Sequence, residues 1–292
     1  MRKIAIIGIV LTVPVVWVIV ASFKTEAKFN SPTLQNNPQQ IKKNINLQSG
    51  QIKIENLVNQ AQGEFGVVVQ YLETGERVAV NANEPFYAAS VTKVPLLITL
   101  YRLYEENQLT PETKVTYLEE DAEWGDGTIQ NDPFGTKYTL EQVAWHLAKE
   151  SDNVAKNMLY RILPWEEIAK TFRAVGVEPN TAENIFTTEE MAKVWEYLYK
   201  CSNTLELSAK SVDQIFELLA NTTTEERIPA AVPEGVKVAH KIGTWSDTGS
   251  WHDCGIVFLE NPVLVCVMGK NSTYEESLQT IRNVTTIAIS TP

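Results

Sequence analysis

Strand-like segments lie at both ends of the chain, with helix-like segments between them. Residues 65–72 and 77–80 are mostly apolar segments on either side of a glycine-containing turn, which is typical of a β-hairpin. Three further strand-like segments follow only at residues 236–244, 251–259 and 263–269. Helical periodicity occupies the interval at residues 90–106, 139–149, 152–161, 165–175, 188–200 and 208–219. This order predicts an α/β fold of the α+β type: an antiparallel five-stranded sheet flanked by helices, with an all-helical subdomain of about residues 90–220 inserted in it.

The first 50 residues predict export. Arg2 and Lys3 precede an uncharged apolar run over residues 4–23, and twenty residues of helix rise about 30 Å, enough to cross a bilayer core. The small-residue pattern at the end of the run is weak, so residues 1–23 are interpreted as a membrane anchor, with a cleaved signal segment as the alternative. Either predicts that the remainder lies outside the cytoplasm. Residues 24–50 are rich in Asn, Gln and Lys, which predicts a flexible linker to a catalytic domain at 51–292.

Charge and metal-ligand content exclude several classes of function. The net charge is −11, and an acidic protein repels nucleic acid, so no nucleic-acid partner is expected. The chain has three His and three Cys but no C-x-x-C or H-E-x-x-H motif, so we expect no metal and no other cofactor. Cys254 and Cys266 lie on neighbouring predicted strands. We expect buried thiols there, because disulfides between adjacent strands have demanding geometry and the number of cysteines is odd.

Two short motifs combine a serine with a possible proton carrier. Ser90 begins a predicted helix, and Lys93 follows one turn later, where a desolvated lysine amine can activate the hydroxyl as a nucleophile. Ser151 belongs to an S-D-N motif at the start of the helix predicted at residues 152–161, and its hydroxyl can relay a proton. The Asn153 amide of the same motif can bind a carbonyl group. Taken singly, each pattern is explained as well by ordinary helix capping and an exposed lysine.

A third motif, Lys241-Ile242-Gly243-Thr244, lies on a predicted strand. Gly243 would leave room for a substrate along the strand edge, and the N–H group of Thr244 could face that substrate. The simpler alternative is that Lys241 protects an edge strand from aggregation.

In this order the three motifs resemble those of class A β-lactamases and penicillin-binding proteins, which carry S-x-x-K, then S-D-N, then K-[TS]-G. The resemblance covers most of residues 51–292. It implies that Ser90 attacks the carbonyl of a β-lactam or D-alanyl amide, with Lys93 as general base. Ser151 would pass a proton to the departing nitrogen, assisted by the charge of Lys241. The N–H groups of Ser90 and Thr244 would form the oxyanion hole. The implied substrate-binding residues are Asn153, Gly243 and Thr244.

The sequence departs from this family in three places. The E-x-x-L-N segment, whose glutamate activates the deacylating water in class A enzymes, is absent, and Glu178 and Glu183 are the acids in the corresponding segment. Ile242 replaces a hydroxyl residue, and Cys254 stands where many class A enzymes carry an arginine for the substrate carboxylate. His252 precedes Asp253, but without a G-x-S-x-G motif we expect a structural role for it.

These observations predict an exported serine acyl-enzyme with slow deacylation. Its substrate would be a small-molecule β-lactam or a peptidoglycan-stem-like amide, and its membrane contact would be residues 4–23. One alternative is a true β-lactamase with a non-standard water activator. Another is a non-catalytic binding or sensor module on the same fold. Trp124, Trp245 and Trp251 are candidates for an aromatic rim of the cleft or for buried core.

Overall fold

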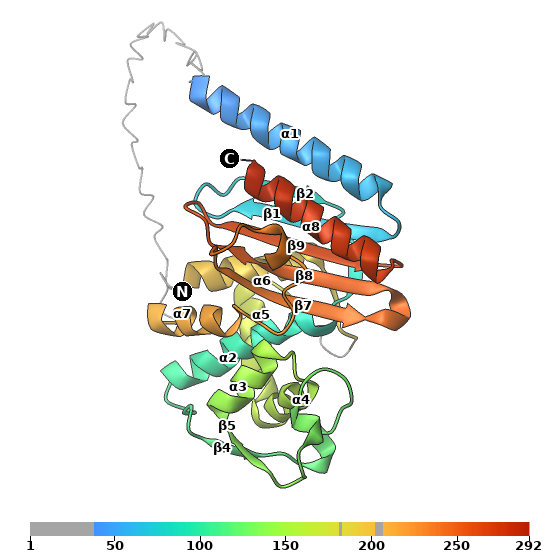
Figure 1. Ribbon diagram of the computed structural model, residues 1–292. Coiled ribbons are helices and arrows are strands. Elements are labelled where there is room, and N and C mark those ends of the chain that lie inside the picture. Colours follow the sequence, from blue (N-terminus) through green and yellow to red (C-terminus); the bar gives the residue numbers. More distant parts are fainter. Residues whose placement is uncertain (1–37, 181–182, 202–206, 292) are drawn as a thin grey trace, which may run out of the picture. The chain divides into compact units, whose positions relative to one another are not determined.

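The structure is a computed structural model that describes residues 38–180, 183–201 and 207–291 (Figure 1). The predicted membrane segment at residues 4–23 and the first part of the predicted linker lie outside these ranges. In the part of the chain that is described, no helix combines the length and the apolar character needed to cross a bilayer.

A five-stranded antiparallel sheet lies at the centre of the protein. Its strands are β1 (Glu64–Tyr71), β2 (Arg77–Val80), β7 (Val238–Trp245), β8 (Ser250–Val257) and β9 (Val263–Lys270). Their order is β2-β1-β9-β8-β7, so a strand from the start of the domain pairs with one from its end, Val67 opposite Val267. This confirms the prediction of one sheet built from distant segments.

The two faces of the sheet bury separate hydrophobic cores. Helices α1 (Pro38–Gln60) and α8 (Tyr274–Ser290) cover one face (Figure 1). Successive strand residues point to opposite faces, so Val67 packs in the core beneath these helices, whereas its neighbour Val68 packs with Cys266 in the core on the other side.

The helical subdomain lies on that other side of the sheet (Figure 1). Its helices are α2 (Lys93–Glu105), α3 (Leu140–Lys149), α4 (Asn153–Ile162), α5 (Trp165–Val175), α6 (Thr188–Cys201) and α7 (Ala209–Leu218). Two small sheets join its connections: β3 (Pro85–Tyr87) with β6 (Ile185–Thr187), and β4 (Lys114–Thr116) with β5 (Lys137–Thr139).

The helix predicted at residues 90–106 begins as a short 3-10 turn, η1 (Ala89–Thr92), which leads directly into α2. Pro95 is the third residue of α2. The first N–H groups of a helix have no partner within the helix, so proline costs no hydrogen bond there.

The structure corrects the predicted linker at residues 24–50. Helix α1 begins at Pro38, so residues 38–50 are helical. Proline is favoured in the first turn of a helix, and Gln and Lys are good helix formers, which explains why this polar segment is helical.

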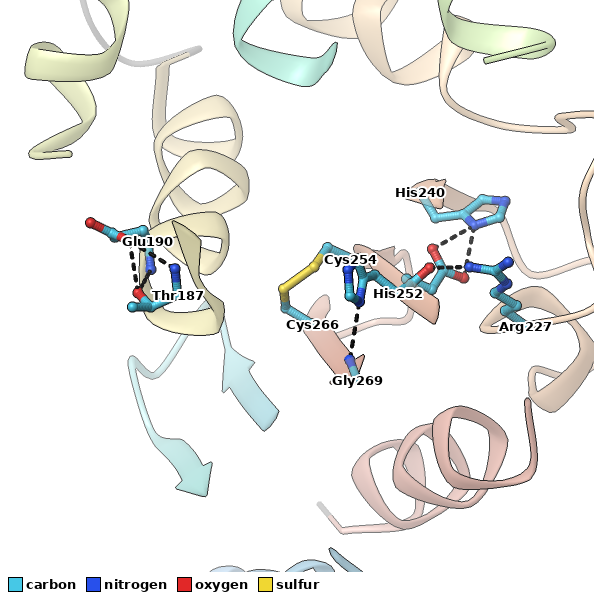
Figure 2. Close-up of a disulfide and its surroundings, with 9 residues drawn as sticks. Thr187, Glu190, Arg227, His240, His252, Cys254, Cys266 and Gly269 are labelled. Atoms are coloured by element: carbon cyan, nitrogen blue, oxygen red, sulfur yellow. Dashed lines mark hydrogen bonds and ion pairs between the residues drawn. A yellow bond between two sulfur atoms is a disulfide. The ribbon is translucent and has the colours of Figure 1, made fainter. Parts of the chain in front are cut away.

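The structure also corrects the expectation of buried thiols. Cys254 and Cys266 form a disulfide between β8 and β9 (Figure 2). The two residues are directly opposite each other in the register of the two strands, with Cα atoms 3.9 Å apart, so their side chains meet on one face. Adjacency of the strands was predicted, but this exact register was not.

Candidate active site

Ser90 lies in η1, just before α2, and borders a cleft with a volume of about 390 Å³. This position is near the positive end of the α2 dipole. Lys93, Asn153 and Thr244 border the same cleft, so it contains residues from all three sequence motifs. Ser151 and Lys241 do not border this cleft: both are buried, and Ser151 borders a neighbouring pocket together with Asp126.

The turn that presents Ser90 depends on Asn184, a residue that sequence reasoning missed. Ala89 has a left-handed backbone with φ of 49°, a conformation that costs a non-glycine residue about 1–2 kcal/mol. The Asn184 side chain donates a hydrogen bond to the Ala89 carbonyl (3.1 Å) and accepts one from the Thr92 hydroxyl (3.2 Å). Its own carbonyl accepts the Ala88 N–H (2.8 Å). Asn184 therefore holds the backbone on both sides of Ala89, next to Ser90.

The Lys93 amine joins the first motif to the second. Its Nζ donates to the Ser151 backbone carbonyl, lies 2.8 Å from Asn153 Oδ1 and is 3.4 Å from Ser151 Oγ. The side chain is buried, with only 2% of Lys93 exposed. This geometry brings the predicted base and the predicted proton relay within reach of each other.

Several groups act on the protonation of Lys93. Burial has the largest effect and, with the positive charges of Lys241 and Lys156, holds the pKa of Lys93 well below its usual value. Asp126 and Asp152 oppose this shift. A lysine with a lowered pKa is neutral more often, and only the neutral amine can accept a proton.

The S-D-N motif contains a buried serine and an aspartate that caps a helix. Ser151 is buried and has a left-handed backbone with φ of 57°. Asp152 caps α4 by accepting the Ala155 N–H (2.8 Å), and its other oxygen accepts the Ile129 N–H (2.9 Å). Asp152 thereby fixes the loop in which Ser151 and Asn153 lie.

Lys241 is buried on β7, the edge strand beside η1. Burial is the main reason that its pKa falls to about 7, and Arg227 lowers it further, whereas Asp126 and Asp253 act to raise it. Lys241 is also close enough to Lys93 for their charges to repel.

Gly243 has a different role from the one expected. A Cβ atom on Gly243 would lie 2.7 Å from the Ala88 carbonyl oxygen and 3.2 Å from Val91 Cγ1. The space beside Gly243 is therefore filled by the turn that carries Ser90, and is not open to a substrate.

Arg227 is a second residue that sequence reasoning missed. Its buried guanidinium donates to the Gly243 carbonyl (3.1 Å), to Thr244 Oγ1 (2.7 Å) and to the His252 carbonyl (Figure 2). The guanidinium places a positive charge next to Thr244, which borders the cleft. A cation from another segment therefore lies beside Thr244, although Cys254 supplies none. No local sequence pattern specifies the contact between Arg227 and Thr244, which depends on tertiary structure.

His252 is structural, as expected. Its Nδ1 accepts the Gly269 N–H (3.0 Å; Figure 2), so Nε2 carries the proton and donates to the Tyr87 carbonyl (2.8 Å). Burial lowers the pKa of His252 to about 4, so the ring is neutral. It connects the sheet to the segment before Ser90 and is not a catalytic base.

Carboxylates and aromatic rings complete the cleft. Glu183 borders it, whereas Glu178 does not; Glu123 borders it as the ion-pair partner of Lys156 (2.9 Å). Trp124 and Trp245 also border the cleft, while Trp251 packs against Tyr274.

One group of side chains has metal-ligand character. Among the described residues, His146, Glu150 and Asp152 bring possible ligand atoms within 4.8 Å of one another. Both Asp152 oxygens accept backbone N–H groups, and His146 Nδ1 lies 2.9 Å from Glu150 Oε2. Hydrogen bonding within the protein therefore accounts for this group.

Comparison with known proteins gives consistent matches. The profile described as "Beta-lactamase enzyme family" matches residues 51–291. β-Lactamase VEB-1 of Pseudomonas aeruginosa is 25% identical over 241 residues, which are 74% of this chain and 80% of that protein. A mutant of PBP-A, solved as an acyl-enzyme complex with penicillin G, superposes with a TM-score of 0.75 at 24% identity, covering 84% of this chain and 96% of that one. A β-lactamase from Sphaerobacter thermophilus also superposes with a TM-score of 0.75, at 22% identity and with coverage of 83% and 96%.

Proposed function

The chain belongs to the β-lactamase enzyme family, and we propose that this serine β-lactamase-like hydrolase forms an acyl-enzyme at Ser90. Its substrates are β-lactams or D-alanyl-type amides, and the acyl-enzyme is hydrolysed slowly. The observation that carries the proposal is the position of Lys93. Its buried amine, bonded to Ser151 and Asn153, borders the same cleft as Ser90. A binding module has no need of a desolvated amine beside a serine.

The proposed acylation uses these groups in sequence. The neutral Lys93 amine accepts the proton of the Ser90 hydroxyl as its Oγ attacks the carbonyl carbon. The N–H groups of Ser90 and Thr244 stabilise the negative oxygen that forms. The carbon–nitrogen bond then breaks, and the departing nitrogen takes a proton relayed from Lys93 through Ser151, whose Oγ is 3.4 Å from Lys93 Nζ.

A substrate carboxylate has a proposed binding place at the Thr244 end of the cleft. Lys241 and Arg227 both lie behind this wall, and the Arg227 guanidinium is 2.7 Å from Thr244 Oγ1. Two buried cations attract an anion at that end, which compensates for the aliphatic Ile242.

Slow deacylation is proposed because the acyl-enzyme needs an activated water to be hydrolysed. The segment between α5 and β6 lacks the E-x-x-L-N glutamate. A solved PBP-A mutant with penicillin G attached shows that a protein of this fold can hold such an adduct long enough to be observed.

Export remains part of the proposal. The uncharged run at residues 4–23 supports it, and so does the Cys254–Cys266 disulfide, because disulfides persist mainly outside the reducing cytoplasm. A peptidoglycan-stem-like amide, with β-lactams as its mimics, would be a substrate in that location.

Labelled penicillin tests the proposal directly. The wild-type protein is incubated with the label, and the adduct is followed by denaturing gel and intact mass. We expect a stable adduct that is lost in Ser90→Ala. Ser246→Ala is the matched control, because Ser246 borders the same cleft and should leave labelling unchanged. Equal labelling of Ser90→Ala, or no wild-type adduct and no hydrolysis of any β-lactam, would reject the proposal.

A true β-lactamase is the second candidate, and the position of Glu183 favours it. Glu183 borders the cleft with Ser90, so its carboxylate is a possible activator of the deacylating water. Rapid turnover of a chromogenic cephalosporin without adduct accumulation would support this candidate. In that case Glu183→Gln should trap the adduct, while the control Glu178→Gln, outside the cleft, should not.

A further inference from the structure

A buried pair of charged groups lies next to residues Lys241–Thr244 of β7. His240 and Asp253 are both fully buried on the adjacent strands β7 and β8. His240 Nδ1 lies 2.9 and 3.0 Å from the two oxygens of Asp253. Neither residue borders the cleft, and none of the steps proposed above uses them.

The pair is charged. Burial acts to lower the pKa of His240, but the carboxylates of Asp253 and Glu225 raise it to about 9. His240 Nε2 lies 3.2 Å from Thr222 Oγ1 and 3.5 Å from Glu225 Oε1. His240 is thus an imidazolium at neutral pH, and Asp253 is its main counter-ion.

Asp253 also holds the segment that carries Arg227. Its Oδ2 accepts the backbone N–H of Ile228 (3.0 Å), and its negative charge attracts the Arg227 guanidinium. Arg227 in turn donates to Gly243 and Thr244. One carboxylate therefore links three segments: β7, β8 and the loop that contains Arg227.

We propose that Asp253, with His240 as its counter-ion, is a positioning residue for acylation: it holds Arg227 against the Thr244 wall and sets the electrostatic potential at Lys241. The inference rests on the function proposed above. Neither residue touches the substrate; they act through Arg227 and Lys241.

The effect at Lys241 follows from the charges that surround it. Lys93 on α2 and Arg227 repel its ammonium form. Asp126, on the loop bordering the cleft, and Asp253 attract it. Removing the Asp253 carboxylate takes away one of these two attractions and leaves more net repulsion at Lys241. Removing the His240 charge while Asp253 stays negative leaves more attraction. The two partners of one ion pair should therefore shift Lys241 in opposite directions.

The test is the rate of acylation by labelled penicillin as a function of pH in Asp253→Asn and His240→Gln, using the same folded domain. Loss of the Lys241 proton is expected to produce the alkaline fall in rate. We expect this fall to move to lower pH in Asp253→Asn and to higher pH in His240→Gln, each by about 0.5–1 pH unit. Asp253→Glu, which keeps the charge, should restore the wild-type position.

A substitution that removes a hydrogen bond to His240 but no charge distinguishes an effect on positioning from an effect on stability. Thr222→Val removes the hydroxyl beside His240 Nε2 without changing a charge, so it should lower the melting temperature but leave the pH profile in place. If Asp253→Asn does not fold, the shift in His240→Gln relative to Thr222→Val still decides the question. Shifts in the same direction, or no shift in a folded His240→Gln protein, would overturn the inference. Absence of any wild-type adduct would instead reject the proposed function.

Discussion

Gly243 and Ala88 are in backbone contact: a Cβ atom at residue 243 would lie 2.7 Å from the Ala88 carbonyl oxygen. This contact sets the spacing between β7, which carries Lys241 and Thr244, and η1, which carries Ser90. The spacing matters because the proposed oxyanion hole takes one N–H group from each side.

Gly243→Ala should therefore damage both stability and acylation. We expect a loss of about 1–3 kcal/mol in the free energy of unfolding, as for other overpacked sites, and at least a tenfold slower labelling of the folded protein. Urea unfolding and labelling kinetics measure the two effects. Gly66→Ala is a suitable control, because its Cβ atom would meet Thr188 of α6 and Phe86 of β3 without separating β7 from η1. If both variants label at the wild-type rate, the contact does not set the geometry.

Local patterns explain what could be predicted from the sequence. The helix predicted at 165–175 coincides with α5 (Trp165–Val175), because its apolar positions recur with helical spacing and Gly176 ends it in a left-handed conformation. Ser90, Lys93, Ser151 and Lys241 could be predicted as site residues because each lies in a short motif of recognisable chemistry.

The missed features all depend on strand register or on long-range contacts. The disulfide required Cys254 to be directly opposite Cys266, and a shift of one residue would turn one sulfur to the other face. Arg227 reaches Thr244 from a segment 17 positions earlier, and Asn184 holds a turn 95 positions earlier. No local pattern specifies such distances, so these residues could be assigned only from the tertiary structure.

The Asn184 side chain is expected to be needed for the geometry of the nucleophile. Asn184→Ala removes the hydrogen bond to the Ala89 carbonyl, so the left-handed turn at Ala89 should relax. We expect a loss of about 1–3 kcal/mol in the free energy of unfolding and a clear decrease in labelling rate. Asn180→Ala removes a neighbouring side chain whose hydrogen bond to Glu183 is long (3.4 Å), and should retain the wild-type rate. Similar rates in both variants would show that Ser90 is positioned without Asn184.

The Cys254–Cys266 disulfide should contribute to stability but not to chemistry, because both sulfurs are buried in the core away from the cleft. Replacing both residues by Ala should lower the free energy of unfolding by about 2–3 kcal/mol, the effect of cross-linking a loop of this length. Unfolding curves with and without reductant measure it, and alkylation with mass analysis checks that reduction releases two thiols. A double variant as stable as the oxidised wild type would contradict this expectation.

Lys93 should be far more important than the other lysine that borders the cleft. Lys93→Ala removes the proposed base, and positioned proton transfer contributes about 10²–10⁴-fold, so labelling should slow by that factor. Lys156→Ala is the matched control, because Lys156 is held by Glu123 and is expected to change the rate less than tenfold. Melting temperatures of both variants must show that they are folded. Near-normal labelling of Lys93→Ala would mean that another group takes the Ser90 proton.

The pH dependence of acylation should reflect two lysines in opposite protonation states. Lys93 must be neutral to act as a base, and burial and its cationic neighbours lower its pKa, so the rate should rise as pH increases through that lowered value. Lys241 must keep its proton to attract the substrate carboxylate, and burial lowers its pKa to about 7, so the rate should fall as pH increases above about 7. Labelling rates measured over a wide pH range should therefore rise with loss of the Lys93 proton and fall with loss of the Lys241 proton. In Lys241→Arg the charge persists at all these pH values, so the alkaline fall should disappear while the acid limb stays. A wild-type rate that keeps rising through pH 9 would show that the ammonium form of Lys241 is not required.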